Sequence, residues 1–294
     1  MDDKLVSIVV PTIPKRNKYL MGALDSVRNQ TYKNIEIIVV SDDRISATQA
    51  RNEGIRKAKG DFIAFLDDDD KLKPTKIEEQ VWYMLYNPDC PLVVTHSLDK
   101  RFGRTRINKP PKTVTHKMIL KAFNLSSTST YMVRRSSLEK IAMKYDLSKI
   151  RDKCGDCNKI MTCWHDFDVG IWCEKELICD DIRYLLRNQH EKQYFDESFP
   201  SAQEYDLAIR LSQLGDIHCV PKVLVTQGVS EGQISENWNK KIKGIISISR
   251  KYHKEYKIRD YVKTVGVLGL FAMGFVVGNR IYKVIIPIKE MYEK

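Results

Sequence analysis

Short apolar runs alternate with amphipathic stretches along the first hundred residues of the chain. Mainly apolar runs are typical of strands buried on both faces of a sheet, and they lie at 6–10, 35–40, 62–66 and 92–95. Stretches with apolar residues at helical spacing separate them, at 16–32, 47–59 and 75–86. Because strand and helix alternate with short connections, the pattern predicts an α/β fold with a doubly wound, mostly parallel sheet.

The pattern is less regular in the second half of the chain. The expected elements there are a helix at 136–144, a helix that Gly215 ends, a strand at 217–225 and a basic helix at 237–256. Five of the seven cysteines fall within 145–192, which indicates an insertion. We therefore predict a main domain at 1–230 that contains the Cys-rich insertion, and a helical C-terminal region at 231–294.

Four consecutive carboxylates, Asp67 to Asp70, follow the third apolar run in the sequence DFIAFLDDDD. In an open parallel sheet, ligands bind at the carboxyl ends of the strands. Two like charges about 4 Å apart repel by about 4 kcal/mol at an effective dielectric constant near 20, so the run needs compensation. A divalent cation would supply it, because hard cations bind carboxylate oxygens. The alternative is a solvated acidic turn that caps the next helix.

The cysteines of the insertion include a C-x-x-C pair, which is a common half of a zinc site. The candidate ligands for structural Zn²⁺ are Cys154, Cys157, Cys163 and Cys173, with His165 and Cys179 as further donors. The spacing of the second half is irregular, so unbound thiols and a disulfide remain alternatives.

Positive charge is concentrated at the C-terminal end of the chain. The formal net charge is +11, and residues 240–294 hold 13 Lys and Arg against 4 Asp and Glu. The uncharged stretch 264–279 is short for a membrane span and has basic flanks. An interfacial or re-entrant membrane element, a buried helical hairpin and a true span are the alternatives. With no secretory signal at the first residues, we expect a cytoplasmic protein, peripheral on the cytoplasmic face of the membrane.

Three segments, in this order and spacing, resemble the N-terminal half of family 2 glycosyltransferases. They are VSIVVPTIPKRNKYLMGALDSVRNQTYKNIEIIVVSDD, ATQARNEGIRKAKGDFIAFLDDDD and FDESFPSAQEYDLAIRLS. The resemblance covers residues 5–225 with the insertion left out. It implies the Rossmann-like GT-A fold and a hexosyltransferase-type reaction. In that reaction a sugar moves with inversion from a nucleotide sugar, expected to be UDP-linked, to an acceptor hydroxyl.

The resemblance also implies roles for residues at the ends of the first two strands. Pro11, Thr12 and Asp43 match the positions that hold the nucleotide base. A carboxylate suits a uracil N–H because it only accepts hydrogen bonds. Arg51 faces the nucleotide or braces the acidic run, and both alternatives stay open.

The Asp-x-Asp element of the family maps onto Asp67, Asp68 and Asp69. The resemblance makes Asp69 the first candidate ligand of Mg²⁺ or Mn²⁺, with Asp67 as a second. Asp67 or Asp68 is expected to meet the ribose or a metal-bound water. The cation would bridge the diphosphate and stabilise the leaving group.

The position of the family's catalytic base falls on Glu204, where relatives usually have Asp. Glu204 would accept the proton of the acceptor hydroxyl, and Asp206 is the competing candidate. Relatives often carry a His near the metal after the last strand, and Gln227 is the candidate for that place here.

The expected partners follow from the resemblance and the basic, apolar C-terminal region: a nucleotide-sugar donor, a glycan or lipid-linked acceptor and a membrane surface. A sugar nucleotidyltransferase is a weaker alternative, because the loop PTIPKRN has no glycine. A basic nucleic-acid-binding protein with a zinc module is a second alternative. The positive charge lies beside an apolar stretch rather than among surface aromatics, so we expect no nucleic-acid partner.

Overall fold

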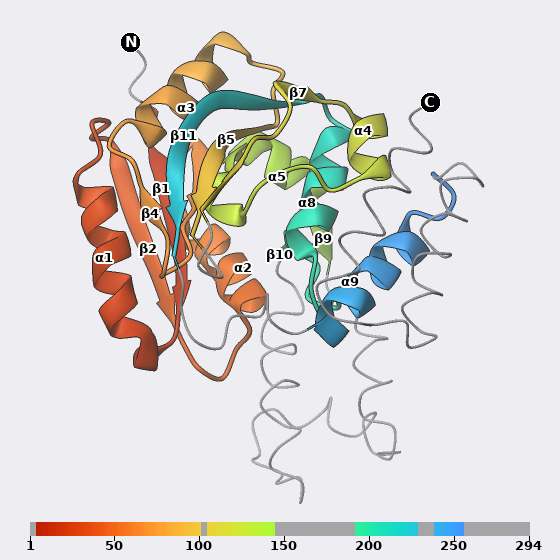
Figure 1. The fold of residues 1–294 in the computed structure, drawn as a ribbon, viewed down its shortest axis with the longest axis horizontal. Coiled ribbons are helices and arrows are strands. Elements are labelled where there is room, and N and C mark those ends of the chain that lie inside the picture. Colours follow the sequence, from red (N-terminus) through yellow and green to blue (C-terminus); the bar gives the residue numbers. More distant parts are fainter. Residues whose placement is uncertain (1–3, 101–104, 145–191, 229–237, 256–294) are drawn as a thin grey trace, which may run out of the picture.

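The computed structural model of the chain describes residues 4–100, 105–144, 192–228 and 238–255. These residues form a mixed α/β fold in which helices cover both faces of a curled sheet (Figure 1). The described part of this sheet has nine strands, with β2, β1, β3, β8, β5, β11 and β4 in spatial order, β6 on β5 and β7 on β11. The predicted insertion and the stretch 264–279 lie outside the described residues, Lys192 excepted.

The elements have the following bounds. The strands are β1 (Val6–Thr12), β2 (Ile35–Ser41), β3 (Phe62–Phe65), β4 (Lys71–Leu72), β5 (Leu92–Asp99), β6 (Arg106–Asn108), β7 (Thr113–Val114), β8 (Met132–Arg134) and β11 (Ile217–Gln227), and β9 (Met143–Lys144) pairs with β10 (Lys192–Gln193) in a separate sheet. The helices are α1 (Asn17–Arg28), α2 (Ala47–Lys57), α3 (Lys76–Tyr86), α4 (His116–Lys121), α5 (Arg135–Ile141), α8 (Gln203–Ser212) and α9 (Trp238–Lys251), with short 3-10 turns η1 (Pro14–Arg16) and η3 (Thr128–Thr130).

The sheet is more mixed than the sequence pattern predicts. Strand β1 pairs in parallel with β2 and β3, and β5 pairs in parallel with β11. Strand β8 lies antiparallel between β3 and β5, and β4 is antiparallel to β11. Strands β8 and β4 have only three and two residues, too few for a hydrophobic period to show.

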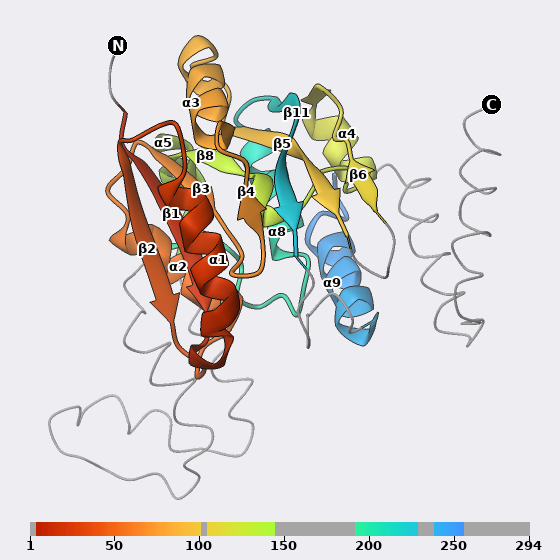
Figure 2. The same cartoon turned by 60° about the vertical axis from the view of Figure 1, so that its left-hand side comes forward.

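Two apolar clusters fill the space on the two faces of the sheet. Helices α1 and α3 pack on one face, and α2, α4, α5 and α8 pack on the other. A Cβ atom at Gly54 would lie 2.3 Å from Val9 Cγ1, so α2 packs directly on β1. Figure 2 shows α1 across the strands at one end of the sheet and α9 beside α8 at the other.

Helix α1 is shorter than the predicted 16–32. It ends at Arg28, with Asn29 as its C-cap. The Gln30 side chain then donates to the backbone oxygens of Ser26 and Lys73, at 2.9 Å each. Gln30 thus ties the chain after α1 to the segment after β4, a long-range contact that helical periodicity does not contain. The carboxyl ends of β1, β2 and β3 nevertheless meet at one edge of the sheet, as expected.

Candidate active site

The four aspartates form a tight turn directly after β3. The backbone N–H of Asp70 donates to the backbone oxygen of Asp67 at 3.0 Å. The backbone N–H of Asp67 donates to Ser129 Oγ in η3, also at 3.0 Å. The acidic turn therefore sits at the carboxyl end of a buried strand, where the sequence predicts it.

Arg16 compensates the charge on one side of this turn. Its Nε lies 2.8 Å from Asp68 Oδ2, and its Nη2 lies 2.7 Å from Asp68 Oδ1 and 3.1 Å from Asp69 Oδ2. Thr12 Oγ1 also donates to Asp68 Oδ2, at 2.7 Å. The hydrogen bond to Asp68 is the main cause that raises the pKa of Arg16. Asp68 is thus buried with its carboxylate oxygens engaged, and Arg16 is a site residue that sequence reasoning missed.

Arg51 compensates the charge on the other side. Its Nη2 lies 2.5 Å from Asp67 Oδ1, and its side chain is 13% exposed. Burial opposes the positive charge, but Asp67, Glu204 and Asp70 together hold the pKa of Arg51 above its usual value. The sequence leaves two alternatives for Arg51, facing the nucleotide or bracing the acidic run, and this contact is of the bracing kind. Its Nε has no hydrogen-bond partner among the described residues.

Asp70 ties the acidic turn to the end of β11. Its Oδ1 accepts the backbone N–H of Gly228 at 2.9 Å. Burial, followed by the charge of Asp67, raises the pKa of Asp70 to about 8. A Cβ atom at Gly228 would lie 1.8 Å from the backbone oxygen of Asp69, so only glycine allows this close approach.

Glu204 lies in the first turn of α8, after Ala202, which has a left-handed backbone with φ of 64°. Burial is the largest effect on Glu204 and raises its pKa. The backbone N–H of Glu204 itself and the charge of Arg51 oppose this rise, and Asp67 adds to it. Arg51 therefore interacts with the acidic turn and with the predicted base at the same time.

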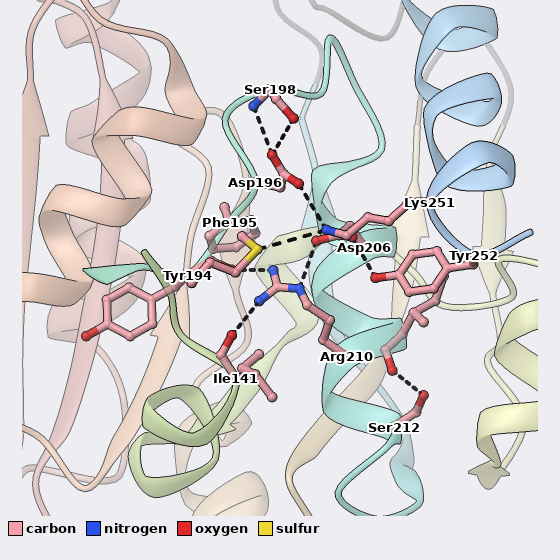
Figure 3. Close-up of polar contacts among 12 residues, drawn as sticks. Ile141, Tyr194, Phe195, Asp196, Ser198, Asp206, Arg210, Ser212, Lys251 and Tyr252 are labelled. Carbon is pink, nitrogen blue, oxygen red and sulfur yellow. Dashed lines mark hydrogen bonds and ion pairs between the residues drawn. The ribbon is translucent and has the colours of Figure 1, made fainter. Parts of the chain in front are cut away.

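A buried ionic network holds α8 in place. Figure 3 shows Arg210, Lys251 and Tyr252 converging on Asp206. Asp206 is fully buried, and it lies 2.9 Å from Arg210 Nε, 2.6 Å from Lys251 Nζ and 2.7 Å from Tyr252 Oη. Burial and the charge of Asp206 raise the pKa of Tyr252. Both Asp206 carboxylate oxygens are thus engaged by protein side chains, which gives Asp206 a structural role in α8.

The segment before α8 is tied down from two sides. Asn52 Oδ1, in α2 next to Arg51, accepts the backbone N–H groups of Tyr194 and Phe195 at 3.1 and 2.8 Å. Lys251 Nζ lies 2.9 Å from Asp196 Oδ2 (Figure 3). Helix α2 thus anchors both the acidic turn and the segment that leads to Glu204.

The predicted base-binding residues lie at the ends of β1 and β2. Pro11 and Thr12 are buried in the last part of β1, and Asp43 is exposed two residues beyond β2. Its neighbour Asp42 is engaged by Arg44, at 2.8 Å. Within the described part of the chain the Asp43 carboxylate has no hydrogen-bond or ion-pair partner, so it is open to a ligand.

The acidic turn fits a divalent cation by its donor chemistry. No three His, Cys, Asp or Glu side chains gather as a metal cage in the described ranges. Mg²⁺, however, is usually held by one or two carboxylates together with substrate phosphates. Asp67 and Asp69 supply such oxygens. Next to Gly228, the buried Gln227 Oε1 lacks a hydrogen-bond donor among the described residues.

Several predicted features cannot be placed. The zinc candidates Cys154, Cys157, Cys163 and Cys173 and the stretch 264–279 lie outside the described residues. The described Cys90 and Cys219 are buried free thiols. In the parts of the chain that the structure covers, no helix has the length and apolarity needed to cross a membrane.

The chain thus belongs to the class of α/β proteins with charged side chains at the carboxyl ends of parallel strands, the edge where open α/β sheets bind ligands. Residues 7–49 and 44–142 match the model of glycosyl transferase family 2. An uncharacterised glycosyltransferase of Methanocaldococcus jannaschii is 29% identical over 246 residues, 73% of this chain and 77% of that protein. The match supports assignment of the chain to this family.

A second relative and two solved structures are also similar to this chain. The Escherichia coli UDP-Glc:alpha-D-GlcNAc-diphosphoundecaprenol beta-1,3-glucosyltransferase WfaP is 29% identical over 166 residues, 48% of this chain and 65% of that protein. S. aureus TarS 1-349 in complex with UDP-GlcNAc has a TM-score of 0.51 at 14% identity, over 90% of this chain and 81% of that one.

The mannosyltransferase PcManGT from Pyrobaculum calidifontis, in complex with GDP-Man and Mn²⁺, has a TM-score of 0.53 at 11% identity, over 99% of this chain and 81% of that one. At these identities the structures show the fold alone. The family match and the relatives support a glycosyltransferase function.

Proposed function

We propose that the chain transfers a sugar, of the hexose type, from a UDP-linked donor to an acceptor hydroxyl with inversion. One observation carries this proposal: Arg51 contacts Asp67 of the acidic turn after β3, and its charge also acts on Glu204 at the start of α8. Donor and acceptor would meet at this point, with a leaving group on one side and a base on the other.

The donor nucleotide would lie across the carboxyl ends of β1 and β2. Asp43 would accept the uracil N–H with its exposed carboxylate. Pro11 and Thr12 would form the floor of the site for the nucleotide base. The Thr12 hydroxyl already donates to Asp68, so Thr12 would contact the base by packing rather than by a hydrogen bond from this hydroxyl. The printed names of WfaP and of the TarS complex, which contain UDP-Glc and UDP-GlcNAc, support the choice of a UDP-sugar.

Asp69 and Asp67 would hold Mg²⁺ or Mn²⁺, and Asp68 would stay a structural partner of Arg16. A bound cation supplies charge stabilisation for the departing diphosphate. The presence of Mn²⁺ in the PcManGT complex supports a divalent metal. Arg16 and Arg51 keep the turn folded before a cation binds, because they offset repulsion among its carboxylates.

Glu204 would accept the proton of the acceptor hydroxyl, which favours a single displacement with inversion at the sugar carbon. Its pKa is raised by burial, which makes it a stronger base than an exposed carboxylate. The charge of Arg51 opposes this rise.

The acceptor would be a glycan carried on a polyisoprenyl phosphate or another membrane lipid. The name of WfaP contains a diphosphoundecaprenol acceptor. Residues 240–294 carry most of the positive net charge, which suits an anionic lipid surface on the cytoplasmic face. With the predicted domain boundary at 230, this basic region would follow the catalytic domain.

Two substitutions test the proposed roles of metal and base. Glu204→Gln should reduce sugar transfer by about 10²- to 10⁴-fold while nucleotide binding is retained.

Asp69→Ala should abolish donor hydrolysis that depends on Mn²⁺ or Mg²⁺. Glu78→Gln, on α3, is the matched control, because Glu78 bonds Thr31 away from the site. A donor affinity that changes neither when a chelator is added nor in Asp69→Ala would contradict the metal role.

A further inference from the structure

Tyr131 carries a buried hydroxyl without a partner. It lies between η3 and β8, is fully buried, and its hydroxyl makes no hydrogen bond to any described residue. A buried O–H without a partner costs free energy, so such a group in a well-packed core calls for an explanation. The ring packs in the apolar cluster that also contains Leu207 and Ala208 of α8.

The carboxylate of Glu204 lies on the same helix, one turn before these two residues. Its negative charge reaches Tyr131, and with burial it raises the pKa of that hydroxyl well above the usual value. A raised pKa favours the protonated hydroxyl, which is the form that donates a hydrogen bond. The other charged groups that act on Glu204 are Arg51 from α2 and Asp67 from the acidic turn.

Glu204 lacks a donor of the kind that Tyr131 offers. The guanidinium of Arg51 directs its hydrogen bond to Asp67 Oδ1 rather than to Glu204. In the described part of the chain, no side chain donates a hydrogen bond to the Glu204 carboxylate. A glutamate has one more rotatable bond than an aspartate, so its carboxylate needs an external contact to fix its direction.

We infer that Tyr131 is a positioning residue whose hydroxyl donates a hydrogen bond to the Glu204 carboxylate and aims it at the acceptor hydroxyl. The inference rests on the proposed role of Glu204 as the base. Catalytic hydrogen bonds are often long in the absence of substrate and tighten when it binds. The unpartnered Tyr131 hydroxyl and the Glu204 carboxylate would form this hydrogen bond when an acceptor is bound.

The test removes the hydroxyl and keeps the ring. Tyr131→Phe should lower kcat for sugar transfer by about 10-fold. KM for the donor should stay unchanged, and the melting temperature should stay unchanged or rise. Tyr194→Phe is the matched control, because it removes a hydroxyl that bonds Glu139 instead, and kcat should be retained. Unchanged kcat in Tyr131→Phe, or a lower melting temperature with loss of donor binding, overturns the inference.

A second background separates positioning from packing. In Glu204→Asp the carboxylate is one methylene shorter, so the Tyr131 hydroxyl should no longer reach it, and adding Tyr131→Phe should change kcat less than about 2-fold. An equal loss in both backgrounds overturns the inference. If Glu204→Gln transferred sugar at the wild-type rate, Glu204 would not be the base. That result would overturn the proposed function, and it is distinguishable from a failure of the Tyr131 inference alone.

Discussion

Arg16 and Arg51 place two positive charges against the acidic turn, and each has a separate task. Arg16 engages Asp68 and Asp69 together with Thr12, and this locks the turn to the end of β1. Arg51 engages Asp67 and also acts on Glu204, and this links the turn to the start of α8. The charge repulsion within the run of aspartates is thus already reduced by the protein itself.

Lys76 is the residue whose charge the fold opposes most clearly. It is fully buried at the start of α3, and its Nζ has no hydrogen-bond partner in the described ranges. Burial lowers its pKa from 10.5 to about 7. Between these two pH values the unfolded chain binds one more proton than the folded chain, so folding stability rises with pH.

We therefore predict that Lys76→Met stabilises the fold most at neutral pH. The free energy of unfolding should rise by about 3 to 5 kcal/mol at pH 7, and by less than about 1 kcal/mol at pH 10. Urea unfolding at both pH values measures this, with Lys73→Met as an exposed control from the same segment. An equal gain at both pH values would show that the charge of Lys76 is not the cause.

At the scale of elements, the contact between the end of β11 and the acidic turn controls the geometry of the site. Gly228 sits against the Asp69 backbone and donates its N–H to Asp70. Any side chain at this position must push the turn away from β11. A substitution at Gly228 should therefore lower the free energy of unfolding and weaken donor binding at the same time.

Gly228→Ala should lower the free energy of unfolding by about 2 kcal/mol and weaken nucleotide-sugar binding. Gly22→Ala in α1 is the matched control, because its Cβ would meet only the flexible end of the Lys71 side chain, with Cε at 3.3 Å. That control should be neutral or stabilising by up to about 1 kcal/mol, as for Gly to Ala in a helix. Denaturant unfolding and donor titration measure both effects. If the two variants behave alike, close packing at Gly228 is not what shapes the turn.

The elements with a clear hydrophobic period could be predicted from the sequence. Strands β1, β2 and β3 and helix α2 lie within about two residues of their predicted ranges. Strands of two or three residues, such as β4 and β8, carry no period and were missed. The contacts of Arg16, Tyr131 and Gly228 depend on segments far apart in the chain, which no local pattern contains.

At the scale of the whole molecule, the sheet gathers segments from the entire described chain at one edge. Thr12, Asp43, the acidic turn and Glu204 come from four separate stretches of the sequence. Helix α9 joins this arrangement through Lys251 and Tyr252, which hold α8 by way of Asp206. Residues Lys251 and Tyr252 thus connect the end of α9 to the helix that carries Glu204.

The most direct measurement is a thermal-shift titration with a panel of nucleotide sugars, with and without Mn²⁺, on the wild type, Glu204→Gln and Asp69→Ala. We expect a UDP-sugar to raise the melting temperature of the wild type and of Glu204→Gln by several degrees when Mn²⁺ is present. The shift should vanish in Asp69→Ala. No shift with any nucleotide sugar, or the same shift in all three proteins without metal, would contradict the account.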